Sequence, residues 1–357
     1  MTLDDADLAR LTAIARHRRW PTDGDALVNE IRAVSARYND PTNASFARLG
    51  PEALAARLLF WFPRDAPKAA AAVRELVRHG DLAPGPKPLR VLDLGAGLGA
   101  ATFGLERALG VRVDPTLVDT DANALSLAGE ILGSHAKLRT GDLSRVEGGP
   151  WDVIIAMQVL SELDREAPAD ARLTKHAALI ARWLRALAPN GTLVLIEPAL
   201  RDRARHLHAI PLPQDANVYA PCLHSRPCAM PERDWCHEDL PVDLPPSLVP
   251  LARAAGLRFE RLTFAYRLVR LDGAALRVHL GDTPCARIVG VPPRTKGRCD
   301  RVVCGDDGAV RRIIRLDRHE NTINAGFDEL TRGDLVDALP DRIPADLAIK
   351  TRQRSER

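Results

Sequence analysis

The fold is decided by one short stretch, Arg90-Val-Leu-Asp-Leu-Gly95-Ala-Gly97-Leu-Gly99. Its first half is an apolar run with the length of a buried strand. Its second half is a turn with three glycines, and a helical segment follows to about Leu109. Glycine permits a tight turn and lets a ligand approach the backbone closely. The stretch therefore predicts a strand, a ligand-binding turn and a helix.

The same alternation continues after this stretch. Buried apolar runs that alternate with amphipathic helices indicate a parallel, doubly wound α/β sheet. We therefore expect a Rossmann-like domain over residues 87–272. Its further strands are expected at 116–119, 137–140, 151–156 and 192–197, and its helices at 122–132 and around 173–187.

The regions around this domain differ from it in composition. Residues 1–86 carry helical periodicity, and residues 205–245 are an irregular insertion rich in Pro, Cys and His. Residues 273–340 predict a small C-terminal β region with a basic hairpin, and residues 341–357 predict a polar tail.

Two ligands compete for the glycine turn. The pattern Gly95-x-Gly97-x-x-Ala100, with Asp119 about 20 residues further on, also satisfies the dinucleotide-binding fingerprint. An acidic residue before the first glycine and a third glycine at position 99 favour S-adenosyl-L-methionine instead. That ligand has no pyrophosphate, and its ammonium group attracts a carboxylate. A turn that has lost its ligand is the third alternative, and Asp142 could simply cap a turn. The expected cofactor-binding residues are Asp93, Gly95, Gly97, Gly99, Asp119, Asp142, Leu143 and Gln158.

The sequence names no catalytic residue. The segment after the strand at 151–156 lacks the Asn/Asp-Pro-Pro-aromatic pattern of exocyclic amine methylation. Cys222 follows a proline, as the nucleophile of 5-methylcytosine enzymes does, but it lies within a group of cysteines. A methyl transfer would therefore rest mainly on the orientation and proximity of the reactants.

Six cysteines lie in the second part of the chain, and none lies in the first 221 residues. No export signal is evident, so we expect reduced thiols that are available to a metal. Four thiolates suit Zn²⁺ or an iron–sulfur cluster equally well, and buried apolar cysteines are the alternative. Cys285 and Cys299 fit that alternative better, and His224 and His237 would lie next to the metal ligands. The expected ligands are Cys222, Cys228, Cys236 and Cys304.

Composition limits the class of protein. Lys and Arg number 50 against 47 for Asp and Glu, which excludes a polybasic tail. Eight basic residues lie between Arg287 and Arg315, either as a solvated hairpin face or as a surface for RNA phosphates. The acidic N-terminus and the absence of a long apolar run predict a cytoplasmic protein with no membrane contact, and we expect a monomer.

Several of these segments together resemble one known family. They are Val91–Gly97, Val159-Leu-Ser-Glu-Leu163, Ile196-Glu-Pro198, Leu316-Asp-Arg318 and Asn324-Ala-Gly-Phe327, and above all Ala220-Pro-Cys-Leu-His-Ser-Arg-Pro-Cys228 with Trp235-Cys-His237. The family is that of methyltransferase-like assembly factors of the small ribosomal subunit, found in mitochondria and bacteria.

The resemblance implies a methyltransferase fold that binds S-adenosyl-L-methionine, and a partner in the small ribosomal subunit or its rRNA. It also implies a [4Fe–4S] cluster on Cys222, Cys228, Cys236 and Cys304. Three functions remain open: methylation of rRNA, non-catalytic subunit assembly with the cofactor pocket used structurally, and methylation of a small molecule with a structural zinc ion.

Overall fold

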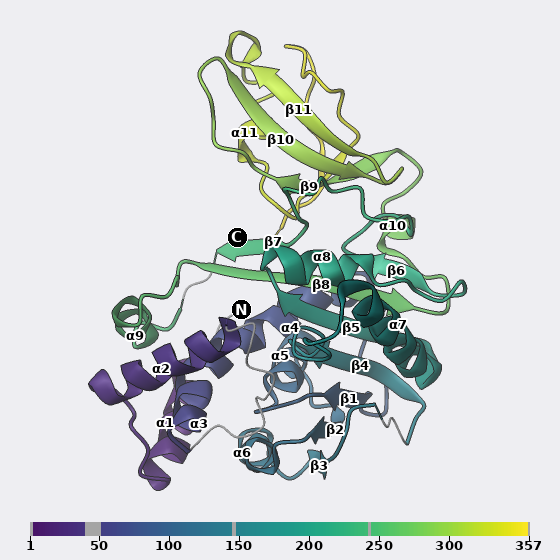
Figure 1. The fold of residues 1–357 in the computed structure, drawn as a ribbon. Coiled ribbons are helices and arrows are strands. Elements are labelled where there is room, and N and C mark those ends of the chain that lie inside the picture. The colour runs from purple at the N-terminus through teal and green to yellow at the C-terminus, as the bar shows by residue number, and fades with distance from the viewer. Residues whose placement is uncertain (1–2, 40–50, 145–147, 242–243, 356–357) are drawn as a thin grey trace. The chain divides into compact units, whose positions relative to one another are not determined.

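The computed structural model describes residues 3–39, 51–144, 148–241 and 244–355. These residues form two compact units. The first unit contains residues 1–197, 210–213 and 241–262, and the second contains residues 198–209, 214–240 and 263–357. Figure 1 labels most of the elements of both units.

The first unit is built on a parallel sheet. Its strands lie in the order β3-β2-β1-β4-β5, and all four neighbouring pairs are parallel. The strands are nearly all buried and apolar at the centre, as expected when helices cover both faces. They are β1 (Arg90–Leu94), β2 (Asp114–Asp119), β3 (Lys137–Thr140), β4 (Trp151–Met157) and β5 (Leu187–Pro198).

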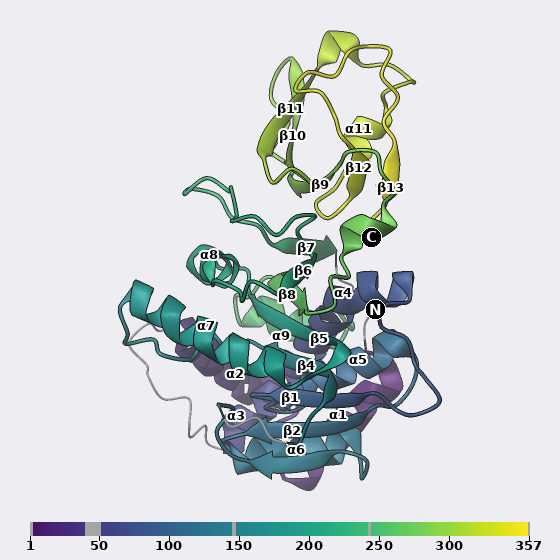
Figure 2. The ribbon, with the colours of Figure 1, turned by 90° about the vertical axis from the view of Figure 1, so that its right-hand side faces the viewer.

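The helices between these strands confirm the predicted Rossmann-like alternation. Figure 2 shows α7 running along one side of the sheet, with α5 on the other. The order of strands reverses between β1 and β4, so ligands are expected at the carboxyl ends of these two strands. The helices between the strands are α5 (Ala100–Leu109), α6 (Ala122–Leu132) and α7 (Ala169–Arg185); α9 (Leu248–Ala254) is a further helix of the first unit.

The N-terminal segment is helical, as its periodicity predicts. Leu27, Ile31 and Val34 are buried on one face of α2, in a core that includes residues of α5 and α6. A single π-helical turn, η1 (Arg57–Trp61), interrupts the run from α3 to α4. The α-helices are α1 (Asp5–His17), α2 (Gly24–Asn39), α3 (Pro51–Ala56) and α4 (Phe62–His79).

The second unit contains an antiparallel sheet with the order β11-β10-β9-β12-β13. The predicted hairpin is confirmed as the pair β10 and β11. The segment 341–357, expected to be a polar tail, includes β13, whose Gln353 is buried against β12. The strands are β9 (Cys285–Gly290), β10 (Arg298–Gly305), β11 (Val310–Leu316), β12 (Leu335–Asp337) and β13 (Thr351–Gln353).

Part of the expected irregular insertion has regular structure. Its N-terminal end belongs to helix α8, and two of its segments are strands that pair with β8. Strand pairing supplies the hydrogen bonds that the sequence pattern does not reveal. The remaining elements are α8 (Arg201–Ala209), β6 (Asn217–Ala220), β7 (Glu238–Pro241), β8 (Arg261–Arg270), α10 (Leu276–His279), η2 (Asp317–His319) and α11 (Gly326–Glu329).

Candidate functional site

The glycine turn lies between the end of β1 and the start of α5. All three of its glycines have positive φ angles, which side chains disfavour. A Cβ atom on Gly95 would lie 2.6 Å from Val159, and one on Gly99 would lie 2.9 Å from Leu132. A Cβ on Gly97 would lie 2.9 Å from a guanidinium nitrogen of Arg57. Gly95 and Gly99 therefore permit close packing against the protein, whereas Gly97 faces a charged side chain.

A cavity of about 360 Å³ opens beside this turn. That volume is within the range of small-molecule sites. Six of the eight predicted cofactor residues line it, and they come from the ends of β1, β2, β3 and β4. These six are Gly95, Gly97, Asp119, Asp142, Leu143 and Gln158.

The other two predicted residues, Asp93 and Gly99, do not belong to the cavity lining that the structure describes. Asp93 is buried beneath the turn, where its Oδ2 atom accepts bonds from the backbone N–H (3.2 Å) and the hydroxyl (2.7 Å) of Thr102. Burial raises the pKa of Asp93 to about 7. In this structure Asp93 therefore holds the first turn of α5, and its contact with a cofactor stays a prediction.

Asp119 organises the mouth of the cavity. Its Oδ2 atom accepts the backbone N–H of Gly97 at 2.7 Å, and its Oδ1 atom accepts that of Asp121 at 2.9 Å. Asp121 in turn caps α6 by accepting the N–H groups of Asn123 and Ala124. One carboxylate thus fixes the glycine turn relative to the start of the next helix.

Gln158 occupies the end of β4 with a positive φ of 62°. Its backbone N–H bonds to the Ile196 carbonyl at 2.7 Å, and its side-chain Nε2 donates to Asp65 at 2.9 Å. Asp65 also pairs with Lys68 at 2.6 Å. Strained backbone of this kind concentrates at functional sites, and here the amide is oriented at the cavity wall.

The loop after β4 is held from β5. The buried Glu197 carboxylate accepts the backbone N–H groups of Leu160 (2.8 Å) and Ser161 (3.1 Å). Arg172 donates to the Leu160 carbonyl at 2.8 Å. These bonds position Glu162, which lines the cavity and whose pKa burial raises to about 7.

Sequence reasoning missed the contribution of the N-terminal helices. Tyr38, Arg57, Trp61, Phe62 and Asp65 all line the cavity, although they precede the glycine turn by 30 residues or more. No local pattern marks them as site residues. Glu162 also escaped assignment, although it lies in the segment Val159–Leu163 that carries the family resemblance.

The four predicted metal ligands lie near one another in the second unit. Burial is the main cause that raises the pKa of Cys222, and the neighbouring Cys304 and Cys228 raise it further, to about 12. The pKa of Cys236 is raised mainly by burial and then by Cys222 and Cys228. The pKa of Cys304 is raised to about 12, mainly by burial and then by Cys236 and Cys228. His224 lies within 3.5 Å of the Cys304 sulfur. Cys285 and Cys299 are buried elsewhere, on β9 and β10.

A metal site is nevertheless not confirmed. Across the part of the chain that the structure describes, no three or more His, Cys, Asp or Glu side chains form a group that could hold a metal ion. The thiols are neighbours within electrostatic range of one another.

The loop that carries Cys222, Cys228 and Cys236 is held by side-chain hydrogen bonds. Arg287 donates to the Pro221 carbonyl at 2.7 Å, and Arg226 donates to the Asp307 carbonyl at 2.6 Å. Arg205 donates to the Pro231 carbonyl at 2.8 Å, and the indole of Trp235 donates to the Ala199 carbonyl at 2.7 Å. These four side chains therefore hold the loop through hydrogen bonds to backbone carbonyls.

The basic stretch from Arg287 to Arg315 is not an open cationic face. Arg287, Arg301 and Arg315 are buried. Four others pair with carboxylates, namely Arg294 with Asp317 and Glu320, Arg298 and Arg312 with Asp300, and Arg311 with Asp307.

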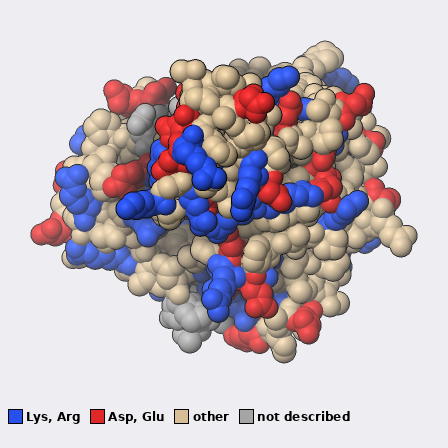
Figure 3. Space-filling model, turned by 90° about the horizontal axis from the view of Figure 1, so that it is seen from above, with Lys and Arg blue, Asp and Glu red and all other residues tan. Residues whose placement is uncertain are grey.

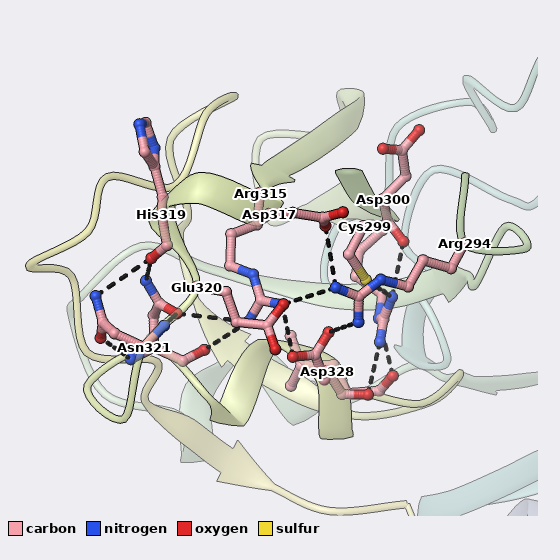
Figure 4. Close-up of polar contacts among 12 residues, drawn as sticks. Arg294, Cys299, Asp300, Arg315, Asp317, His319, Glu320, Asn321 and Asp328 are labelled. Carbon is pink, nitrogen blue, oxygen red and sulfur yellow. Dashed lines mark hydrogen bonds and ion pairs between the residues drawn. The ribbon is translucent and has the colours of Figure 1, made fainter. Parts of the chain in front are cut away.

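Figure 4 shows how closely these charges are matched. The buried Arg315 contacts Glu320 at 2.9 Å and Asp328 at 2.6 Å, and Arg294 reaches the same two carboxylates. Figure 3 shows one face of the protein on which acidic side chains lie among basic ones. Three of the eight basic residues are therefore buried and four are paired with carboxylates, so their number overstates the free positive charge of this stretch; a phosphate-binding surface stays a prediction.

Comparison with known proteins decides the family. Residues 60–334, which include the glycine turn, the cysteine loop and the hairpin, match the model of the family described as mitochondrial small ribosomal subunit Rsm22. This chain belongs to that family. The resemblance found in the sequence is thereby confirmed for the Rsm22 family, and the structure confirms the methyltransferase-like fold.

Solved methyltransferases are similar to this Rsm22-family chain at low identity. A putative RNA methyltransferase from Pyrococcus horikoshii is 16% identical, with 58% of this chain and 85% of that chain covered and a TM-score of 0.36. The plantazolicin methyltransferase in complex with S-adenosylhomocysteine is 12% identical, with 68% and 96% covered and a TM-score of 0.36.

The mitomycin 7-O-methyltransferase is 16% identical, with 47% of this chain covered and a TM-score of 0.30; the chain spans only 43% of that protein. No curated protein matches the chain. Among the described residues, no helix is long and apolar enough to cross a membrane.

Proposed function

We propose that this protein binds S-adenosyl-L-methionine in the cavity of the first unit and acts with the small ribosomal subunit. The observation that carries the cofactor is the cavity itself, which lies at the switch point between β1 and β4 and is lined by the glycine turn and Asp119. The Rsm22 family supports the ribosomal partner.

The chemistry at the site would rest on positioning. When bound, the cofactor would supply an electrophilic methyl group. The chain's own residues would fix the turn through Asp119, orient the amide of Gln158 and shield the site with Tyr38 and Trp61. We assign no general base. Methylation of rRNA, subunit assembly without turnover and methylation of a small molecule therefore remain separate outcomes of experiment.

A binding experiment tests the cofactor. Gly97→Val would place a branched side chain 2.9 Å from Arg57 in the cavity, so calorimetry should show the affinity for S-adenosylhomocysteine reduced at least about tenfold. Gly110→Val is the matched control, because Gly110 also has a positive φ and its added Cβ meets nothing within 4 Å. A folded Gly97→Val variant with wild-type affinity would contradict the site.

Two further measurements separate the functions. Co-sedimentation with immature small subunits should detect the partner, and its absence would favour a small-molecule methyltransferase. Transfer of a radiolabelled methyl group to rRNA should distinguish an enzyme from a non-catalytic assembly factor. The cytoplasmic location and the monomeric state stay predictions; size-exclusion chromatography with light scattering tests the latter.

We also propose a [4Fe–4S] cluster on Cys222, Cys228, Cys236 and Cys304. Four neighbouring thiols support it, as do Arg267 and Arg287, whose positive charges lower the pKa of Cys222 against the effect of burial. Zinc would need thiolates about 2.3 Å from a single ion. Four thiolates suit zinc and an iron–sulfur cluster equally well by ligand type, so metal analysis decides between the two.

A further inference from the structure

We propose that Arg57 binds the carboxylate of the cofactor's amino-acid portion and so selects ligands that carry this carboxylate. The inference rests on the proposed binding of S-adenosyl-L-methionine in the cavity of the first unit. It assigns a role to a residue that lies 38 positions before Gly95 and just outside the matched family segment 60–334.

The position of Arg57 supports this role. It is the first residue of the π-helical turn η1, and its side chain is one of the cavity-lining groups. Its Nη2 atom lies 2.9 Å from where a Cβ on Gly97 would be, so the guanidinium lies directly over the glycine turn. Isolated π-helical turns within helices are frequent at functional sites. Here the turn directs a charged side chain into the cavity.

The charges of the cavity support it further. Five carboxylates line the cavity, and Arg57 is the only Arg or Lys among the described lining residues. The carboxylates are Asp65, Asp119, Asp121, Asp142 and Glu162. A ligand with an ammonium group, a sulfonium group and one carboxylate would therefore find several negative partners for its cations. It would find one positive partner for its anion, and that partner is Arg57.

Arg57 contacts Asp121 and Tyr38 and still retains N–H donors for another acceptor. A guanidinium has five N–H donors and matches a carboxylate through two parallel bonds. The contact of Arg57 with Asp121 is long, at 3.4 Å, compared with about 2.8 Å for an optimal charged hydrogen bond. Asp121 is already used as the cap of α6. A ligand carboxylate beside Nη2 could therefore be bound without breaking the helix cap.

The sharpest test compares two ligands that differ only in this group. Calorimetry should measure the binding of S-adenosyl-L-methionine and of decarboxylated S-adenosylmethionine to the full-length wild-type protein and to Arg57→Met. The wild type should prefer the carboxylate-bearing ligand by at least about tenfold, since a charge-assisted pair is lost in the other. Arg57→Met should lose that preference through weaker binding of S-adenosyl-L-methionine alone.

Two variants complete the experiment. Arg32→Met removes an arginine from the same N-terminal segment that contacts the Ala254 carbonyl and does not belong to the described cavity lining, so both affinities should match the wild type. Arg57→Lys keeps the positive charge but lacks the two parallel N–H donors of a guanidinium. It should therefore show part of the wild-type preference for the carboxylate-bearing ligand. It also serves as the test if the methionine variant does not fold.

The outcomes separate the two proposals. A wild-type protein that binds neither ligand would refute the proposed function. A wild-type protein that binds both ligands equally, or an Arg57→Met variant that keeps the wild-type preference, would overturn the role of Arg57 and leave the cofactor site standing. An equal loss of both affinities in Arg57→Met would also overturn it, because a carboxylate contact affects one ligand only.

Discussion

The carboxylate of Asp119 accepts a hydrogen bond from the backbone N–H of Gly97, with 2.7 Å between the two heavy atoms. This bond joins the end of β2 to the turn that follows β1. The conformation of the turn thus depends on a side chain from the neighbouring strand as well as on its own glycines.

Asp119→Asn should therefore weaken the binding of S-adenosylhomocysteine by about tenfold, because the amide has only one oxygen to accept the two backbone N–H groups. Asp114→Asn, at the other end of β2, is the control and should bind normally, since Asp114 pairs with the exposed Lys137. Calorimetry on both variants measures the difference. Equal affinities would show that the Asp119 carboxylate does not shape the turn.

Glu197→Gln should destabilise the first unit by about 1–3 kcal/mol, because one amide N–H₂ would replace an oxygen that accepts a buried backbone N–H. Urea denaturation followed by circular dichroism measures the loss. Glu166→Gln, in the same loop region but exposed, should leave stability unchanged. A Glu197→Gln variant as stable as the control would mean that the loop after β4 is held by other contacts.

Asp93 should make stability depend on pH. Burial raises its pKa from 3.8 to about 7 in the folded protein, so the folded state binds a proton that the unfolded state has released. The contribution of Asp93 therefore falls as pH rises from about 4 to about 7 and then stays constant. Asp93→Asn removes this contribution. Free energies of unfolding measured across this range should show a shallower fall with rising pH for the variant, and equal slopes would contradict the prediction.

Anaerobically purified protein should be brown and contain about four irons per chain. Cys304→Ser should lose the metal, whereas Cys285→Ser should retain it, because Cys304 lies beside the other three thiols and Cys285 is buried on β9. Iron analysis and the visible absorption spectrum measure both. Colourless protein with stoichiometric zinc would refute the cluster, and loss of metal from Cys285→Ser alone would show that the fourth ligand is assigned wrongly.

Arg315→Met should destabilise the second unit by about 3 kcal/mol, the lower end of the range for breaking a buried ion pair, because its acidic partners are partly exposed. Arg318→Met changes the same residue type three positions further on, where the side chain is exposed, and should have little effect. Thermal unfolding of the two variants gives the comparison. Similar melting temperatures would mean that the network in Figure 4 contributes little to stability.

The sequence predicts the first unit well because its signals are local. Strand and helix periods, and three glycines in one turn, each depend on residues close together in the chain. The cavity is predicted only on the side formed by these segments. Arg57 and Tyr38 reach it through the packing of helices that come much earlier, and no local pattern encodes that contact.

The number of basic residues between Arg287 and Arg315 is a poor guide to exposed positive charge for a related reason. A count treats each arginine as exposed, whereas folding places Arg301 and Arg315 inside the second unit. A signal was present in one case: Arg315 is two positions from the buried Ile313 on β11, so strand alternation places both on the inward face. The alternation of inward and outward positions along a strand is thus a better guide to solvent-exposed charge than the number of basic residues.

The ties that Arg205, Arg226, Arg287 and Trp235 make to backbone carbonyls also bear on which substitutions the cysteine loop tolerates. A backbone carbonyl accepts a hydrogen bond whatever side chain its residue carries, so the accepting positions are free to vary in sequence. The donors are particular side chains, so a change at any of these four positions removes a tie.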